Sequence, residues 1–193
     1  MRYSRFSKKR TGECRYGPLR AKRELKELAC RTEVFLAPLL FDSFFDDLFS
    51  AIKARVNGDL AVPSLPSRYV AADKEGTVAV VSLLYAALCA RRGNVPLRVE
   101  ESKESVCLLL ETGEDDELSL FDKENDSLLS LLRSVAKNSG ISLSVTDTRP
   151  ACLCLRFERY LSVVQVAHAE TQCGCFASER VSRYLSLLAR LSF

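Results

Sequence analysis

One segment constrains the fold more than any other, the apolar run GTVAVVSLLYAALCARR at residues 76–92. Its spacing predicts a helix over 74–92 that is apolar almost all round, which is typical of a helix buried between layers. Asp73 stands where it can cap this helix, and Arg91 and Arg92 lie favourably at the negative end of the helix dipole. The chain therefore needs further elements that cover this helix on more than one side.

The flanking segments supply those layers. A helix over 41–56 presents an apolar face and ends at Asn57 and Gly58, and a leucine-rich helix over 128–138 ends at Gly140. The face of the first helix consists of Phe41, Phe44, Phe45, Leu48, Phe49 and Ile52. Short apolar runs predict strands at 60–62, 69–72, 95–100, 105–111, 141–145, 152–157 and 161–167. The pattern indicates an α+β fold, a two-layer α/β sandwich with a mixed sheet and helices 41–56, 74–92 and 128–139 on one face.

Two terminal segments extend this central domain of residues 41–157. Residues 1–18 have no sustained apolar period and are interpreted as a flexible arm, whereas 19–40 contain an N-terminal helix that Pro38 interrupts. Residues 158–193 add a strand and a final helix over 178–191. The helices at 19–37 and 178–191 each carry an apolar stripe, which either packs onto the same domain or contacts a protein partner.

Composition places the chain among globular cytoplasmic proteins. Hydrophobic residues make up 47% and charged residues 27%, and no apolar run approaches the roughly 18 residues that cross a bilayer. The basic opening has no apolar stretch behind it, so it is not a secretory signal. The eight cysteines include Cys107, Cys152 and Cys154 in expected strands and Cys30 and Cys89 in expected helices. They are predicted to be reduced thiols of the core.

Charge is distributed unevenly along the chain. Residues 1–23 carry nine Lys or Arg and one acid, a net charge of +8, and the remainder carries 19 basic and 24 acidic residues, a net charge of −5. The basic segment is either a solvated tail or an electrostatic contact of residues 1–23 with nucleic acid or an anionic membrane. Tyr3, Phe6 and Tyr16 are interleaved with the basic residues and could stack on bases.

The order of elements over 41–157 is helix, strand, buried helix, two strands, acidic loop, helix and two strands. This order resembles the ATP-binding domain shared by histidine kinases, gyrase B, Hsp90 and MutL. Three strings carry the resemblance: YVAADKEGTVAVVSLLYAAL for the buried helix, GNVPLRVEESKESVCLLLET for the hairpin, and LLSLLRSVAKNSGISLSV for the later helix and strand. The resemblance implies a histidine-kinase-like ATPase fold.

The residues that bind nucleotide in that family have been replaced here. The two asparagines of the buried helix, one of which holds Mg²⁺, fall on Ser82 and Ala86, or on Leu83 and Ala87 in an ungapped alignment. The aspartate that binds adenine falls on Thr112. The glycine-rich lid falls on 126–129 (DSLL), and the acidic run at 114–117 would repel a polyphosphate. Three parts of one site are altered together, which indicates loss of the chemistry.

The remaining candidate residues do not form a catalytic set. The expected helices at 19–56 lack the phosphoacceptor histidine of a histidine kinase, and the only histidine, His168, is interpreted as an ordinary half-buried or surface residue. Cys173 and Cys175 flank Gly174 in an expected turn, and with His168 they supply three metal ligands without a fourth. We therefore assign no catalytic, cofactor-binding or metal-binding residues.

The sequence favours a non-catalytic, kinase-like interaction or regulatory module that has lost ATP binding and contacts a protein partner or itself. One alternative is a nucleotide-binding ATPase with an unorthodox site. Another is a nucleic-acid-binding protein that uses the basic residues 1–23.

Overall fold

A computed structural model describes residues 17–32, 36–55, 60–92, 95–113, 126–146, 151–160 and 174–188. Five helices lie within these residues: α1 (Gly17–Ala29), α2 (Phe41–Lys53), α3 (Lys74–Arg92), α4 (Asp126–Asn138) and α5 (Gly174–Leu188). The strands are β1 (Ala37–Leu40), β2 (Tyr69–Ala72), β3 (Leu97–Glu101), β4 (Ser105–Gly113), β5 (Ile141–Val145) and β6 (Ala151–Glu158). Between residues 41 and 158 the order of helices and strands is the one expected from the sequence.

The strands form two sheets, one of four strands in the order β3-β4-β6-β5 and one of β1 and β2. Every pairing among the described residues is antiparallel, so the prediction of a mixed sheet was wrong. Strand β2 pairs with β1, and it meets the larger sheet at an antiparallel bridge between Val70 and Arg159. The larger sheet therefore consists of two antiparallel hairpins that meet along β4 and β6.

The predicted extent of the N-terminal helix, residues 19–37, was also wrong. Helix α1 ends at Ala29, and Pro38 lies in β1 instead of in a helix. A residue before proline avoids the helical conformation, which favours an extended chain at Ala37. The expected strand at 60–62 is absent too, because residues 60–68 are irregular in the structure. At the other end, α5 begins at Gly174, four residues before the predicted start.

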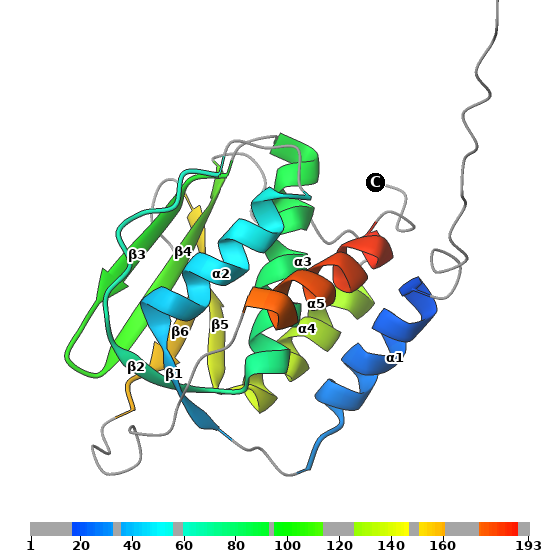
Figure 1. The fold of residues 1–193 in the computed structure, drawn as a ribbon, viewed down its shortest axis with the longest axis horizontal. Coiled ribbons are helices and arrows are strands. Elements are labelled where there is room, and N and C mark those ends of the chain that lie inside the picture. Colours follow the sequence, from blue (N-terminus) through cyan, green and yellow to red (C-terminus); the bar gives the residue numbers. More distant parts are fainter. Residues whose placement is uncertain are drawn as a thin grey trace, which may run out of the picture.

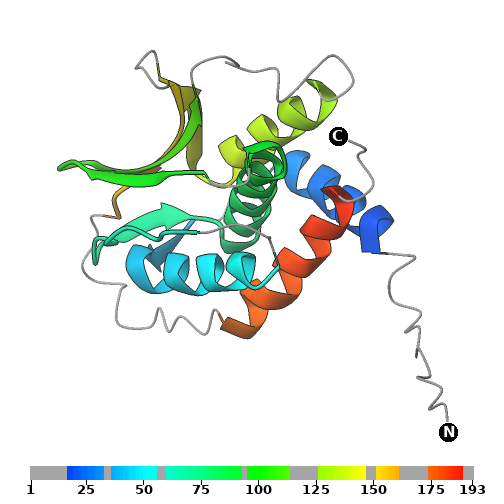
Figure 2. The ribbon, with the colours of Figure 1, turned by 90° about the horizontal axis from the view of Figure 1, so that it is seen from above.

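Helix α3 is buried as its sequence predicted. Every residue from Val78 to Cys89 is buried. At its start, the Asp73 carboxylate accepts a hydrogen bond of 2.7 Å from the backbone N–H of Gly76, which confirms Asp73 as the capping residue. Figure 2 shows α3 in the middle of the molecule, with the four-stranded sheet on one side and α1, α2, α4 and α5 around the rest.

Helices α1 and α5 form an outer layer over the helices that cover the sheet (Figure 1). Helix α5 packs against α3, α2 and α1, and α1 also packs against α4. The apolar stripe of α1, with Leu25 and Leu28, and that of α5, with Val181 and Tyr184, are buried in the same core as the sheet. The two stripes therefore pack onto the same domain, which was one of the two alternatives expected from the sequence. They add a third layer to the predicted two-layer sandwich.

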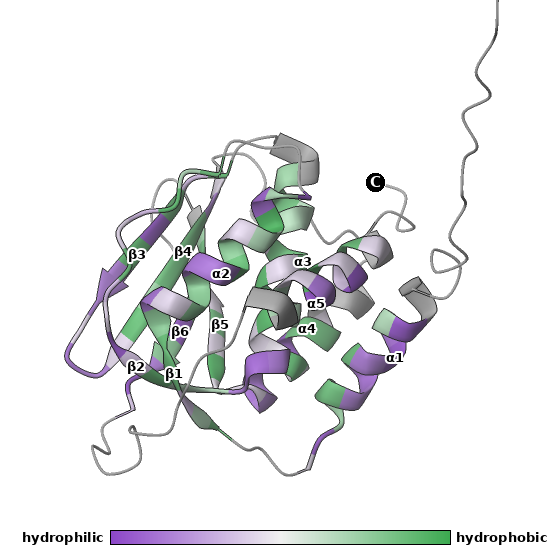
Figure 3. Cartoon of the chain, viewed as in Figure 1, coloured by the Kyte–Doolittle hydropathy of each residue, from purple (hydrophilic) through white to green (hydrophobic). Residues whose placement is uncertain are grey.

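Hydrophobic residues follow this layering, since they run along β4 and α3, whereas α1 carries many hydrophilic ones (Figure 3). The thiols of Cys89 and Cys152 are buried, and those of Cys107 and Cys154 are half-buried. These agree with the prediction of reduced cysteines, but Cys30 is exposed and lies just after α1. Among the described residues, no helix combines the length and the apolar character needed to cross a membrane.

Gly76 allows the start of α3 to lie against Ser139, which follows α4. A Cβ atom at position 76 would lie 1.7 Å from Ser139 Oγ. We expect Gly76→Ala to lower the free energy of unfolding by about 1–3 kcal/mol, because the contact is overpacked. The sign of the change in the free energy of unfolding tests the close packing at Gly76. In a helix position with open space around it, the same Gly→Ala change raises stability by about 1 kcal/mol.

Urea unfolding of the purified chain measures this effect. In a chain that also carries Ser139→Gly, the clashing side chain is gone and Gly76→Ala should cost little. A gain in stability from Gly76→Ala alone would contradict the packing described here.

Candidate functional site

The helix positions that the resemblance assigns to nucleotide binding lie inside the core. Ser82 and Leu83 are fully buried, and Ala86 and Ala87 are 6% and 3% exposed. The Ser82 hydroxyl has no hydrogen-bond partner within the described part of the chain. In either alignment, one of the two positions is an alanine, whose side chain has no oxygen atom with which to coordinate a hard cation such as Mg²⁺.

Thr112 occupies the position of the adenine-binding aspartate near the end of β4. It is 2% exposed and lies at a register shift between Glu111 and Gly113. Its hydroxyl group is neutral, so it lacks the charge of an aspartate. The acidic run at 114–117 lies outside the described residues. Residues 126–129, which match the lid, form the first turn of α4.

The other residues that the sequence singled out are not brought together. His168 and Cys173 lie outside the described residues, and Gly174 and Cys175 begin α5 instead of forming a turn. Among the described residues, no group of three or more histidine, cysteine, aspartate or glutamate side chains is placed to hold a metal ion.

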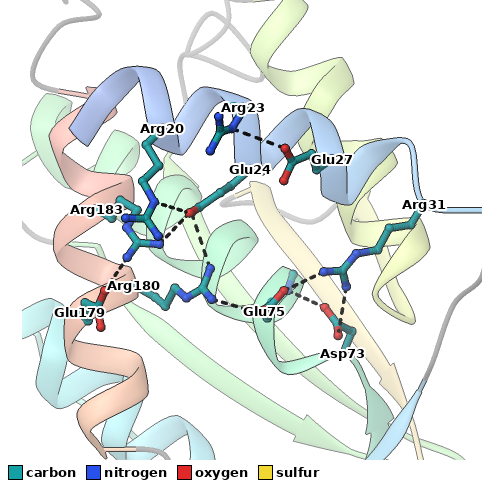
Figure 4. A network of polar contacts seen from close by, with 11 residues as sticks. Arg20, Arg23, Glu24, Glu27, Arg31, Asp73, Glu75, Glu179, Arg180 and Arg183 are labelled. Carbon is teal, nitrogen blue, oxygen red and sulfur yellow. Dashed lines mark hydrogen bonds and ion pairs between the residues drawn. The ribbon is translucent and has the colours of Figure 1, made fainter. Parts of the chain in front are cut away.

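The strongest polar arrangement is one that sequence reasoning missed. It joins α1, the start of α3 and α5, and we call it the Glu24 cluster; it consists of Arg20, Glu24, Arg31, Asp73, Glu75, Glu179, Arg180 and Arg183 (Figure 4). No local signal could have predicted it, because its members are distributed between residues 20 and 183 of the sequence. Only the packing of the outer layer brings them together.

Glu24 lies at the centre of the cluster. Its Oε1 atom accepts hydrogen bonds from Arg183 Nη1 at 2.7 Å and from Arg20 Nε at 3.1 Å. Arg180 links the helices, since its Nη1 lies 3.6 Å from Glu24 Oε2 and its Nη2 donates to Glu75 Oε1 at 2.9 Å. The side chains of Glu24 and Arg183 are only 14% and 10% exposed, so water screens this pair poorly.

A fourth arginine, Arg31, completes the cluster just after the end of α1. Arg31 Nη2 donates to Glu75 Oε2 at 2.7 Å, and Arg31 Nη1 lies 3.6 Å from Asp73 Oδ1. A cavity of about 230 Å³ remains between these groups, lined by Glu24, Glu27, Leu28, Arg31, Glu75, Arg180 and Tyr184. Each carboxylate described above faces a guanidinium, which does not exchange protons at ordinary pH. The cluster therefore has the character of a bridge between helices, not of an acid–base centre.

The cluster also changes the proton affinity of two α5 side chains. Burial alone would lower the pKa of Arg183, but the hydrogen bond and charge of Glu24 outweigh it and raise that pKa. Burial, together with the charge of Glu24, raises the pKa of Tyr184 to about 12. Both groups therefore keep their protons more firmly in the folded chain.

Two thiols meet on the far side of the molecule, on the four-stranded sheet. Burial and the neighbouring thiol of Cys107 raise the pKa of Cys154 to about 11. A thiol that keeps its proton at neutral pH is a poor nucleophile, so Cys154 lacks the activation of a catalytic cysteine.

Comparison with protein-family models and with curated proteins finds no match to this chain. The residues themselves must therefore carry any functional conclusion.

The raised pKa of Tyr184 predicts a loss of stability at high pH. Unfolded tyrosine ionises near pH 10, whereas folded Tyr184 keeps its proton to about pH 12. Over that interval the folded state binds more protons than the unfolded state, so stability falls as pH rises, by roughly 2 kcal/mol in total. Denaturant unfolding from pH 9 to pH 12 measures the fall.

Tyr184→Phe should remove this part of the pH dependence, and Tyr69→Phe, at a half-buried position on β2, should leave it in place. An identical pH profile for the Tyr184→Phe variant and the wild-type chain would show that Tyr184 is not buried against Glu24.

Proposed function

We propose that this chain is a non-catalytic interaction or regulatory module that derives from the histidine-kinase-type ATPase domain and has lost ATP binding. The first support is the order of elements between α2 and β6, which is the order on which the resemblance rests. The proposal assigns the fold to protein contact instead of phosphoryl transfer.

The observation that carries the proposal is the chemistry of α3 and the end of β4. Where the resemblance requires an amide oxygen for Mg²⁺, the chain has Ala86 or Ala87, both buried among apolar side chains. Where it requires a carboxylate for adenine, the chain has the neutral Thr112. Losing a buried hydrogen-bonding partner costs a ligand about 1–3 kcal/mol, and more where a charge is lost.

Together, these losses lower the affinity for nucleotide by a large factor. With the altered lid residues at 126–129 included, three losses weaken binding by roughly 4 kcal/mol or more, which corresponds to about a thousandfold. A micromolar nucleotide site would become millimolar. The alternative of an ATPase with an unorthodox site requires a replacement for each missing group.

The structure gives less support to nucleic-acid binding by the basic residues 1–23 than the amino-acid composition of that segment gives. Arg20 and Arg23 lie on α1, where they form ion pairs with Glu24 and Glu27. These pairs offset part of the positive charge assigned to residues 1–23. Contact with nucleic acid would therefore depend mainly on the residues that precede α1.

The contact surface must also differ from the one that the sequence favoured. The apolar stripes of α1 and α5 are buried against each other and against α3 and α4, so they are not available to a partner. The outer face of the four-stranded sheet, opposite the helices, carries no helix of the described chain (Figure 2). We propose this face as the place where a partner protein or a second copy would bind.

Calorimetric titration with millimolar Mg-ATP tests the loss of nucleotide binding. We expect no saturable binding, because the metal ligand, the adenine partner and the lid glycines are all replaced. Low-micromolar saturable binding would overturn the proposal and favour an active ATPase. In that event Thr112→Ala is the variant that locates the site, since weaker binding would assign the nucleotide to the end of β4.

A further inference from the structure

The outer face of the four-stranded sheet holds two cysteines on neighbouring strands. In the register of β4 and β6, Cys107 pairs with Arg156 and Leu109 pairs with Cys154. The cysteines are therefore diagonal neighbours on one face of the sheet. Leu108 and Leu155, which alternate with them along the strands, are buried in the core, so the cysteines lie on the outer face. Both are half-buried, so reagents in water can reach them.

The two thiols are close enough to interact. The Cys107 thiol and the Ser144 hydroxyl both contribute to the shifted pKa of Cys154. Ser144 lies directly opposite Cys154 on β5, and Glu100 lies directly opposite Cys107 on β3. The pair is thus held in a polar setting by regular strands, which fix its geometry better than a loop would.

The diagonal arrangement suits a bridging ion better than a disulfide. The Cα atoms of a disulfide usually lie about 4.4–6.8 Å apart, whereas diagonal neighbours on antiparallel strands are separated by about 7–8 Å. An ion held between two thiolates spaces the sulfur atoms by roughly 4.6 Å, twice the length of a zinc–thiolate bond. The sheet can therefore accept an ion between these sulfurs with less distortion than a covalent bond.

We propose that Cys107 and Cys154 form a binding site for a soft, thiophilic monovalent cation of the Cu(I) type. Thiolate sulfur selects such cations, and two sulfur ligands satisfy a cation that prefers two-coordinate geometry. On binding, each S–H bond breaks, each proton passes to water, and two sulfur–metal bonds form with no change in oxidation state. Zinc is a poorer candidate, since structural zinc needs four ligands and no group of three candidate ligands occurs among the described residues.

A third cysteine on the same face provides a matched control. Cys152 lies two residues before Cys154 on β6, opposite Glu111, and its sulfur accepts a weak hydrogen bond from Arg98 at 3.5 Å. Cys152 is buried, and it lies four residues before Arg156, the residue of β6 that pairs with Cys107. A site made by Cys107 and Cys154 should not need it.

The test is anaerobic competition for Cu(I) against a chromophoric Cu(I) chelator. The full-length chain is used in a background where Cys14, Cys173 and Cys175, whose side chains the structure does not describe, are serine. We expect the background protein to withdraw one equivalent of Cu(I), Cys107→Ser or Cys154→Ser to lower its affinity at least a hundredfold, and Cys152→Ser to leave it unchanged. Circular dichroism verifies that each variant is folded.

A second measurement on the wild-type chain avoids the dependence on variants. Alkylation followed by mass spectrometry should show Cu(I) protecting Cys107 and Cys154 together, with Cys30 still reactive. The proposal is overturned if the background protein takes no Cu(I), if the Cys107 and Cys154 variants bind as the background does, or if protection falls elsewhere. Rapid formation of a Cys107–Cys154 disulfide with glutathione disulfide would likewise contradict the spacing argument.

Discussion

The rest of the structure depends on the burial of α3. A helix that is apolar on every side cannot lie on the surface of a sheet, because its outer side would face water. The sheet covers one side of α3, α2 and α4 flank it, and α5 closes the remaining side, with α1 packed alongside. The central claim of our account is that α5 belongs to the core because it completes the enclosure of α3.

The Glu24 cluster fixes the orientation of α1 and α5 within that enclosure. Apolar packing alone would tolerate several orientations of α1 and α5, whereas the hydrogen bonds from Arg183 to Glu24 and from Arg180 to Glu75 specify one. Breaking a buried ion pair leaves an uncompensated charge, so these contacts penalise alternative dockings. The same enclosure bears on the proposed function. A helix that is packed on all sides, with alanine where the resemblance expects a metal ligand, offers a nucleotide little to bind.

Much of the central domain was predictable from sequence, because its signals are local. The face of α2, the Asp73 cap of α3, the β3–β4 hairpin and the elements α4, β5 and β6 all follow from spacing within a short window. The antiparallel pairing of both sheets, the length of α1 and the packing of the outer layer were not predictable in this way. Strand pairing depends on partners far apart in the sequence. Pro38 favours an extended conformation at the residue before it, but β1 is a strand only because it pairs with β2.

The candidate sites also differ in whether their signals are local in the sequence. The proposed replacement of the residues that bind nucleotide in the resembling family can be judged from the sequence, since it concerns residue types at fixed positions. The Glu24 cluster and the contact between Cys107 and Cys154 cannot, because they depend on how distant helices pack and on the register of two strands. Cys107 and Cys154 were expected to be core residues, yet they are only half-buried, because alternation along the strands directs them away from the helices. Cys152, on the same face, is buried as expected.

Native-state hydrogen exchange of the intact chain tests the central claim most directly. If α5 encloses α3, the amides of 78–89 in α3 and of 177–184 in α5 should exchange only through global unfolding, with one shared free energy of opening. If the α5 amides instead exchange through a separate, low-energy opening while α3 stays protected, α5 is an appendage and our account of the core is wrong.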